Sequence, residues 1–302
     1  MDERRLEVFR AVAAELNFSR AALSLHLSQS AVSQQIAALE HELGGALFDR
    51  SRRRVRLTPA GATLQGRVDG LLGEFAEARR LVAAARGEVA GELRVVASRT
   101  VGTYLLSAPI AELGRRHPDL RLRLRIENSE RVVRALPAGQ ADVGYVEDTV
   151  SYPGVVLEPL FDDELVVVAA GTHRFARLAE VAPEDLAAEP IVAREPGSGT
   201  RRVAEEQLRA AGVRPEALRV VAELAGIEAI KGAVEAGLGV AILSRLTLRK
   251  ELALGTLVAR PLAGVPMRRT IFAMALAGGT ELPAARRLTE LLAASARSGR
   301  DR

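Results

Sequence analysis

The pattern of apolar and polar positions changes along the chain. In the N-terminal part, apolar side chains recur every three or four residues, a spacing that predicts amphipathic helices. The first helix is expected over residues 3–16, with one apolar face made of Leu6, Phe9, Val12, Ala13 and Leu16. From Gly91 onward, short apolar or alternating runs are separated by helical patterns, which predicts strands joined by helices.

Two short helix signals stand close together within residues 18–61, separated only by Leu27-Ser28. Ser19 is expected to cap the first helix and Ser28 the second, because a serine hydroxyl accepts a hydrogen bond from an amide of the first turn. The apolar stripe of the second helix consists of Val32, Ile36, Leu39 and Leu43. The face roughly opposite carries Ser30, Ser33, Gln34 and Ala37. Amides pair with adenine and hydroxyls with several base edges, so this pattern predicts a helix-turn-helix that enters the major groove of DNA.

An arginine-rich turn follows the second helix, after Gly44-Gly45. Five of the seven residues from Arg50 to Arg56 are arginine, and the flanking apolar residues predict a short hairpin. An isolated charge run is more often a solvated loop, but its place beside a recognition helix favours phosphate and minor-groove contacts. The candidate DNA-binding residues are Ser28, Gln29, Ser30, Ser33, Gln34, Arg50, Arg52, Arg53 and Arg54.

Thr58-Pro59 predicts the start of a long helix, because threonine caps well and proline needs no amide partner in the first turn. Its apolar residues alternate spacings of four and three, as in a coiled coil. They are Leu64, Val68, Leu71, Phe75, Ala78, Val82 and Ala85. The alternative is a helix packed on its own domain. We favour a dimerisation helix over 59–87, since two-fold DNA sites need two copies of the reader.

Beyond Gly91 the pattern predicts an α/β region. Strands are expected at 93–97, 120–126, 142–146, 155–160, 165–170, 190–194, 218–223, 240–243 and 267–276. Helices are expected at 100–116, 129–136 (capped by Ser129), 200–211, 227–236 and 283–294. Such alternation predicts parallel sheets in two lobes, with a ligand cleft at the carboxyl ends of the strands.

Two loops between a strand and a helix stand out as candidate ligand sites. The first contains Ser98, Arg99 and Thr100, and plain helix capping is its alternative explanation. The second, 194–201, contributes Arg194, Gly197, Ser198, Gly199 and Thr200. Glycines that expose amides, together with hydroxyls at a helix start, suit a phosphate, sulfate or carboxylate. The second loop lacks the lysine and spacing of a nucleotide-binding P-loop.

Composition narrows the choice of function. The chain has 302 residues, 48% of them apolar, with a net charge of only +4 although its pI is near 10.0. A nucleic-acid surface must therefore be local. There is no cysteine, the four histidines are scattered without metal spacing, and no nucleophile elbow occurs, so we expect no metal, no cofactor and no enzyme activity. No secretion signal or membrane-length apolar run is present, and a cytoplasmic protein is expected.

The N-terminal region resembles the LysR-type transcriptional regulators. The resemblance is carried by Phe18-Ser19-Arg20-Ala21-Ala22, by 25–36, by Leu39-Glu40, Leu43-Gly44 and Leu47-Phe48-Asp49-Arg50, and by Leu57-Thr58-Pro59-Ala60-Gly61. It implies a winged helix-turn-helix domain over 1–58, a homodimer through 59–87, a homotetramer, and RNA polymerase as a further candidate partner. Many members have Arg or Lys where this chain has Gln34, which shifts electrostatic attraction to the wing.

The resemblance extends over 91–302 and implies a bilobed fold like the periplasmic binding proteins. Lobe one would comprise 91–162 and 267–302, and lobe two 163–266. The loop 194–201 resembles members that sense small oxyanions or phosphorylated metabolites, and Glu223 with 226–231 matches a cleft segment of the family. We therefore expect a DNA-binding regulator modulated by a small anionic effector. The alternative is an α/β enzyme acting on a phosphorylated substrate, with an N-terminal assembly domain.

Overall fold

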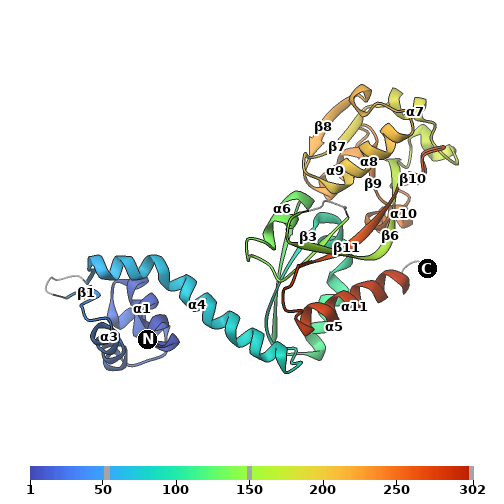
Figure 1. Cartoon of the computed structure of the whole chain (residues 1–302). Helices are drawn as coiled ribbons and strands as arrows, with labels where there is room; N and C mark the ends of the chain where they lie inside the picture. Colours follow the sequence, from blue (N-terminus) through green and yellow to red (C-terminus); the bar gives the residue numbers. More distant parts are fainter. Residues whose placement is uncertain (51–54, 148–151, 299–302) are drawn as a thin grey trace. The chain divides into compact units, whose positions relative to one another are not determined.

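The computed structural model describes residues 1–50, 55–147 and 152–298. The chain divides into two units, Met1–Ala85 and Arg86–Arg302 (Figure 1). Each unit has its own hydrophobic core, and each is treated by itself below.

Unit 1 is built on helices α1 (Glu3–Glu15), α2 (Phe18–Ser24) and α3 (Gln29–Glu42). The predicted cap of α3 is confirmed, because the Ser28 hydroxyl accepts a hydrogen bond from the amide of Ala31 at 3.2 Å. The predicted cap of α2 is wrong. Asn17 takes that role by accepting from the amide of Arg20 at 3.0 Å, and Ser19 lies inside the helix.

The apolar faces of these helices stop one residue earlier than the sequence pattern predicts. Val32, Ile36 and Leu39 are buried in the core of unit 1, but Leu43 lies beyond the end of α3 and is about half exposed. Leu16 is also exposed, because it ends α1 in the left-handed conformation with φ of 45°. A residue beyond the last helical turn no longer lies on the apolar face of the helix. The helical spacing of apolar residues therefore mispredicts the residue that follows the C-terminus of α1 and the one that follows the C-terminus of α3.

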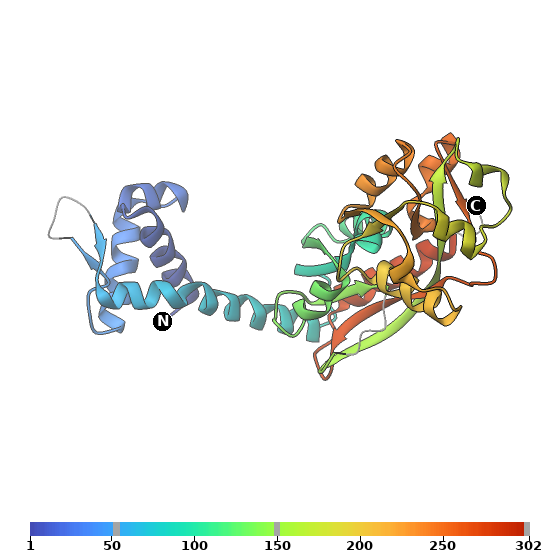
Figure 2. The ribbon, with the colours of Figure 1, turned by 90° about the horizontal axis from the view of Figure 1, so that it is seen from above.

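A short antiparallel hairpin, β1 (Phe48–Asp49) and β2 (Arg56–Leu57), follows α3 as predicted (Figure 2). The next helix, α4 (Pro59–Ala85), begins at Thr58, whose hydroxyl accepts from the amide of Gly61 at 3.0 Å. A Cβ at Gly61 would lie 2.1 Å from the carbonyl oxygen of Leu47, so glycine is required where α4 crosses the chain before the hairpin.

The two ends of α4 differ in their environment. Val68 and Leu72 are buried in the core of unit 1, with Leu64 and Leu71 packed against it. In the second half of the helix, Val82 is 54% exposed, and Phe75 and Leu81 are also exposed. The first half of the predicted heptad seam therefore packs against the core of its own unit. Only its second half leaves apolar side chains exposed to solvent.

Unit 2 contains a seven-stranded mixed sheet in the order β10-β6-β11-β5-β3-β4, with β9 also pairing with β6. Its strands are β3 (Gly91–Ser98), β4 (Leu120–Glu127), β5 (Val143–Val146), β6 (Val155–Ala170), β9 (Ala241–Ser244), β10 (Leu257–Arg260) and β11 (Arg268–Leu276). A separate parallel pair consists of β7 (Ile191–Arg194) and β8 (Val220–Leu224).

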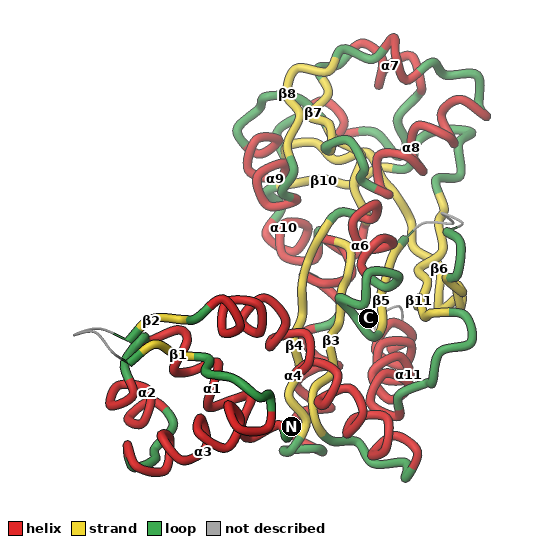
Figure 3. The backbone as a smooth tube through the Cα atoms, turned by 60° about the vertical axis from the view of Figure 1, so that its left-hand side comes forward, coloured by secondary structure: helices red, strands yellow, loops and turns green. Residues whose placement is uncertain are grey.

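Strand β6 passes from one group of strands to another. Its first part pairs with β11, which continues through β5 to β3 and β4, and its last residues pair with β9 and β10 (Figure 3). We call β3, β4, β5 and β11 the first strand group, and β7 to β10 the second. Two predictions are wrong here. Residues 155–170 form one strand rather than two, and only β3, β4, β5 and the pair β7–β8 are parallel among the strands of the described residues.

The helices of unit 2 are α5 (Ser107–Arg116), α6 (Ser129–Ala135), α7 (Pro183–Ala188), α8 (Gly199–Ala210), α9 (Ile227–Glu235), α10 (Arg249–Leu254) and α11 (Pro283–Ser298). Short 3₁₀ turns are η2 (Arg174–Arg177), η3 (Pro215–Ala217) and η4 (Arg245–Thr247). The pattern did not predict α7, α10 or β10, which are each six residues or shorter. The predicted Ser129 cap is wrong, because Asn128 caps α6.

The helix predicted over 100–116 begins differently from an α-helix. Residues Val101–Leu105 form a π-helical turn, η1, and α5 follows it. Such turns are rare and are often found at functional sites. Among the residues that the structure describes, no helix is long and apolar enough to cross a membrane.

Candidate DNA-contacting surface and effector site

The N-terminal turn of α3 is open to solvent. Ser28, Gln29 and Ser30 are exposed, as is Gln34 one turn further on, and Ser33 is half-buried. The hydroxyls of Ser28 and Ser30 lie 2.9 Å apart. The five α3 residues named from the sequence thus lie within two turns of one helix, and their polar groups are accessible to a ligand outside unit 1.

The hairpin is fixed to α3 by Glu40. Its carboxylate accepts hydrogen bonds from the amides of Leu47 at 2.8 Å and Phe48 at 3.1 Å. Arg50 donates to the same carboxylate at 3.3 Å, and its guanidinium lies 4.5 Å from the ring centre of Phe18. Arg50 therefore has partners within unit 1 and helps to orient the hairpin. Arg52, Arg53 and Arg54 lie outside the described residues.

In unit 2, the two predicted ligand loops come together. Thr100 and Thr200, one from each loop, are both buried and both accept hydrogen bonds from Arg269 of β11, at 3.4 Å and 2.9 Å. A second guanidinium, that of Arg194, donates to Thr200 at 3.4 Å. Residues separated by about a hundred positions in the sequence therefore meet at one arginine, which lies on neither loop.

Two buried carboxylates complete this cluster. Asp163 lies directly opposite Arg269 in the pairing of β6 with β11 and accepts from its guanidinium at 2.7 Å. Glu147 lies 3.4 Å from the same guanidinium and accepts from Thr100 at 3.1 Å. Buried charges are tolerated only when they are paired, so these contacts stabilise all three groups together. We call Thr100, Glu147, Asp163, Thr200 and Arg269 the buried polar cluster.

The start of α8 contacts the start of α6 beside this cluster. The amide of Gly199 donates to the Ser129 hydroxyl at 3.2 Å, and that hydroxyl also lies 3.5 Å from Glu147. Ser198 is buried and caps α8, and Gly197 has a φ of 79° that other residues rarely adopt. Ser98 is buried as well and accepts from the amide of Val101, as expected for plain capping.

The remaining predicted residues lie at the edge of this region. Arg99 donates to Glu195 at 3.0 Å, which joins the two loops by an ion pair. Burial alone would raise the pKa of Glu195, but hydrogen bonds from Arg194 and Arg99 outweigh burial and hold that pKa below its ordinary value. Glu223 is exposed and pairs with Arg201 at 2.6 Å.

Tyr104 of the π-helical turn makes a further contact between the strand groups. It packs against a hydrophobic cluster of the second group, and its hydroxyl donates to Glu228 of α9 at 2.5 Å. Burial, followed by the hydrogen bond to Glu228, raises the pKa of Tyr104. The buried Lys231 lies 2.8 Å from Glu228 and 2.7 Å from Glu251, with its ammonium 5.2 Å from the Tyr104 ring centre.

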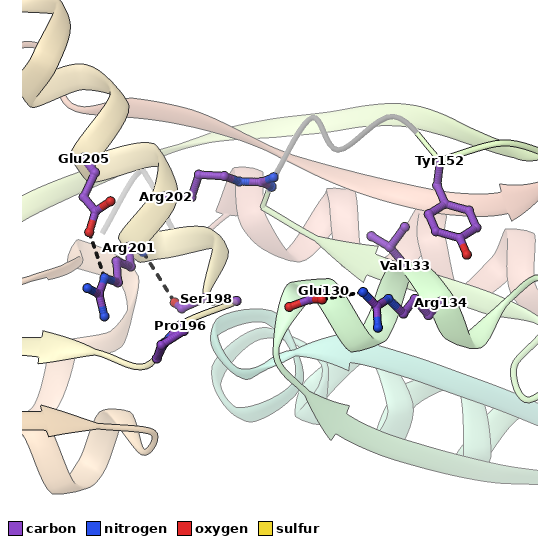
Figure 4. Close-up of a pocket in the computed structure, with 10 residues that line it drawn as sticks. Glu130, Val133, Arg134, Tyr152, Pro196, Ser198, Arg201, Arg202 and Glu205 are labelled. Carbon is purple, nitrogen blue, oxygen red and sulfur yellow. Dashed lines mark hydrogen bonds and ion pairs between the residues drawn. The ribbon is translucent and has the colours of Figure 1, made fainter.

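A pocket lies beside the loop that precedes α8 (Figure 4). It has a volume of 450 Å³ and lies between α6 and the first turns of α8. Glu130, Val133 and Arg134 line it from α6, and Arg201 and Arg202 from α8. It shares only Gly197 and Ser198 with the residues predicted from the sequence.

Two protein families match the sequence of this chain. The family described as "Bacterial regulatory helix-turn-helix protein, lysR family" matches residues 4–62, and "LysR substrate binding domain" matches residues 86–297. The chain belongs to the LysR family of transcriptional regulators. As a LysR-type regulator, it combines a helix-turn-helix DNA-binding domain with an effector-binding domain, as the sequence resemblance implied.

Curated relatives of this LysR-type regulator are transcriptional regulators by name. CysL of Bacillus subtilis is 36% identical over 247 residues, which cover 82% of each chain. The uncharacterised regulator YeiE of Escherichia coli K12 is 39% identical over 261 residues, or 86% of each chain. A probable RuBisCO transcriptional regulator of Nostoc is 34% identical over 273 residues, which cover 89% of this chain and 80% of the relative.

Solved structures agree with the fold of this LysR-type regulator. An H2O2-bound mutant of OxyR from Corynebacterium glutamicum has a TM-score of 0.74 at 23% identity and covers 98% of this chain and 93% of its own, which shows the fold alone. The CcmR regulatory domain of Synechocystis, solved in complex with 2-PG, has a TM-score of 0.61 at 27% identity. It covers 68% of this chain and 97% of its own.

Sequence reasoning missed the centre of the buried polar cluster in this LysR-type regulator. Arg269 and Asp163 were assigned no role. One signal was available for Arg269, because it lies two residues before the buried Ile271 and four before the buried Ala273, on the same face of β11. A charge on the buried face of a strand needs a buried partner, and the pattern did not show that Asp163 would lie opposite.

Proposed function

We propose that this LysR-type regulator contacts DNA through the N-terminal turns of α3 and through the hairpin arginines. The exposed hydroxyls and amides from Ser28 to Gln34 can pair with base edges in the major groove. The arginines beyond Arg50 would neutralise phosphates and supply affinity that depends on salt but little on sequence.

The same proposal includes a homodimer through the second half of α4. Phe75, Leu81 and Val82 expose apolar side chains there, whereas the first half of the helix is packed on its own unit. Two copies joined in this way would present two reading helices to a two-fold DNA site. Assembly of such dimers into a homotetramer, and contact with RNA polymerase, rest on the family resemblance.

For unit 2, we propose that a small anion binds where the two ligand loops meet and that the regulator acts by binding rather than by turnover. The observation that carries this is the meeting of Thr100 and Thr200 at Arg269. The Thr200 hydroxyl accepts from two guanidiniums and still has a proton to donate, which an oxyanion can accept. The 2-PG complex of the CcmR neighbour supports a small-molecule site in this domain.

An anion at this position would contact both strand groups, which we propose act as two lobes. Thr100 follows β3 of the first group, and Thr200 begins the helix that follows β7 of the second. A ligand that binds one arrangement of the lobes more tightly than another shifts the population toward it. That shift would change the spacing of the DNA-binding units in the assembled regulator.

The test is fluorescence anisotropy of the full chain with labelled DNA from its own upstream region, with and without inorganic phosphate or sulfate. We expect Thr200→Val to abolish the response to the anion while DNA affinity without the anion stays within about twofold, because the substitution keeps the shape but removes the donor. Thr270→Val, the matched control, removes a hydroxyl that bonds Asp162 at the surface and should respond normally. Equal loss of DNA binding and anion response would show that Thr200 has a structural role only.

A further inference from the structure

Helix α3 carries two exposed side-chain amides, Gln29 and Gln34, which differ in their partners. The carbonyl oxygen of Gln29 accepts a hydrogen bond at 3.2 Å from the hydroxyl of Ser19, the second residue of α2. The side-chain amide of Gln34 makes no hydrogen bond to another residue of the described part of the chain. The two amides are therefore not equivalent toward DNA.

The hydrogen bond between Ser19 and Gln29 is not needed to hold α2 against α3. Both side chains are exposed, and water competes for an exposed hydrogen bond, so its contribution to stability is small. The two helices already share a hydrophobic core, to which Ala21, Ala22 and Val32 belong. The clearer consequence of the hydrogen bond is the direction in which the Gln29 side chain faces.

The amide group of Gln29 is oriented through its oxygen. A carboxamide is planar and carries its carbonyl oxygen and its NH2 group on opposite sides. When the oxygen is directed to Ser19, the NH2 group is directed away from α2 and offers only hydrogen-bond donors to a base edge. Glutamine recognises adenine through its oxygen and its NH2 group together, whereas guanine O6 and N7 and thymine O4 are all acceptors. This orientation therefore favours guanine or thymine over adenine.

We propose that Ser19 is a positioning residue, which makes Gln29 read a guanine or a thymine in the major groove. Gln34, whose amide is not held, keeps the donor and the acceptor that adenine requires. The inference rests on the proposed contact between α3 and DNA. Where that contact excludes water, solvent no longer competes for the Ser19 hydroxyl, and the hydrogen bond to Gln29 becomes stronger.

A base-preference profile of the full chain tests the proposal. Fluorescence-anisotropy competition would use duplexes in which each base pair of the site protected in its own upstream DNA is changed in turn. The position at which Gln29→Ala loses its preference is the one that Gln29 reads. We expect the parent protein to favour guanine or thymine there over adenine by about tenfold. Ser19→Ala should reduce this ratio to about threefold, because the amide can then turn over and pair in either direction.

Three further variants separate positioning from a structural role. Ser19→Thr keeps the hydroxyl and should keep the preference of the parent protein. Ser24→Ala is the matched control, since it removes from α2 a hydroxyl that donates to the carbonyl oxygen of Ala21, and it should leave the profile unchanged. Adding Ser19→Ala to Gln29→Ala should have no further effect on the profile, because Ser19 acts through Gln29. Affinity for random DNA should stay within about twofold in all of them, since none removes a charge.

The inference is overturned if Ser19→Ala keeps the ratio of the parent protein or if Ser24→Ala lowers it equally. A parent preference for adenine or cytosine at the Gln29 position also overturns it, because the amide would then present its oxygen to the base. An unchanged profile in Gln29→Ala has the same consequence. In that case Gln34→Ala distinguishes the two proposals: a changed profile leaves the contact of α3 with DNA intact, and an unchanged one contradicts that contact as well.

Discussion

Replacing Arg269 by methionine should strongly destabilise unit 2. The Arg269 side chain is only 1% exposed, and its carboxylate partners Asp163 and Glu147 are 0% and 2% exposed. Methionine has a similar length but no charge. The substitution therefore leaves two carboxylates in the interior without the guanidinium that balanced them. It also removes one hydrogen-bond donor to each of the hydroxyls of Thr100 and Thr200.

The size of the effect follows from this burial. Breaking a buried ion pair by removing one partner costs about 3–5 kcal/mol, because the remaining charge stays desolvated. For a unit of this size, 1 kcal/mol lowers the melting temperature by about 2–4 °C. The Arg269→Met variant should therefore melt about 6–20 °C below the parent protein.

Thermal melting followed by far-ultraviolet circular dichroism measures this, since the chain has no tryptophan to report by fluorescence. Arg287→Met is the matched control, because its pair with Glu290 is more than half exposed on both sides and should contribute at most about 1 kcal/mol. Adding Asp163→Asn to Arg269→Met should recover part of the loss, since it removes one of the stranded charges. The reasoning is refuted if Arg269→Met melts no lower than Arg287→Met.

Three other outcomes are expected. Gln34→Ala should change which DNA sequences are preferred in a competition assay with little loss on random DNA, whereas Arg52→Ala should weaken binding to all DNA and reduce the salt slope by about 1. Glu195→Gln should lower the melting temperature at neutral pH. Folding lowers the pKa of Glu195, so the stability that its ionised carboxylate contributes is present above the ordinary glutamate pKa of about 4.3 and is lost as the pH falls through the pKa of the folded state. The melting temperatures of the variant and the parent protein should therefore converge in acid. A difference in melting temperature that does not change with pH would contradict this. Val82→Glu should shift the proposed dimer toward monomer in sedimentation experiments, and an unchanged mass would argue against α4 as the interface.

The helix-turn-helix was predictable because its signals are local. A cap at Ser28, a stripe at Val32, Ile36 and Leu39, and Gly44 after the helix all act within a few residues of one another. The errors are local as well. The caps of α2 and α6 are Asn17 and Asn128, which lie two residues before Ser19 and one residue before Ser129. Asparagine and serine are about equally good caps, so residue type alone does not show which of two nearby positions begins the helix.

Long-range pairing was much harder to predict. The polar run at 162–164 looked like a break between two strands, but these residues face β11, where Arg268, Arg269 and Thr270 lie opposite them. The polar residues therefore belong to a continuous strand whose charged side chains pair with those of the neighbouring strand, and they do not form a loop. For the same reason, both ligand loops were identified from local features, while the arginine that joins them was not.

If an anion binds at Thr100 as we propose, the π-helical turn η1 would affect how long the bound state lasts. Thr100 immediately precedes this turn and Tyr104 lies within it, so a ligand that holds Thr100 would also restrain Tyr104. To separate the strand groups, Tyr104 must leave its apolar surroundings, release Glu228 and expose Lys231 to water. These steps would add to the barrier for opening but not to the encounter with the ligand, so they would slow release of the ligand more than its capture. We expect such a regulator to keep its response for a time after the concentration of its effector has fallen.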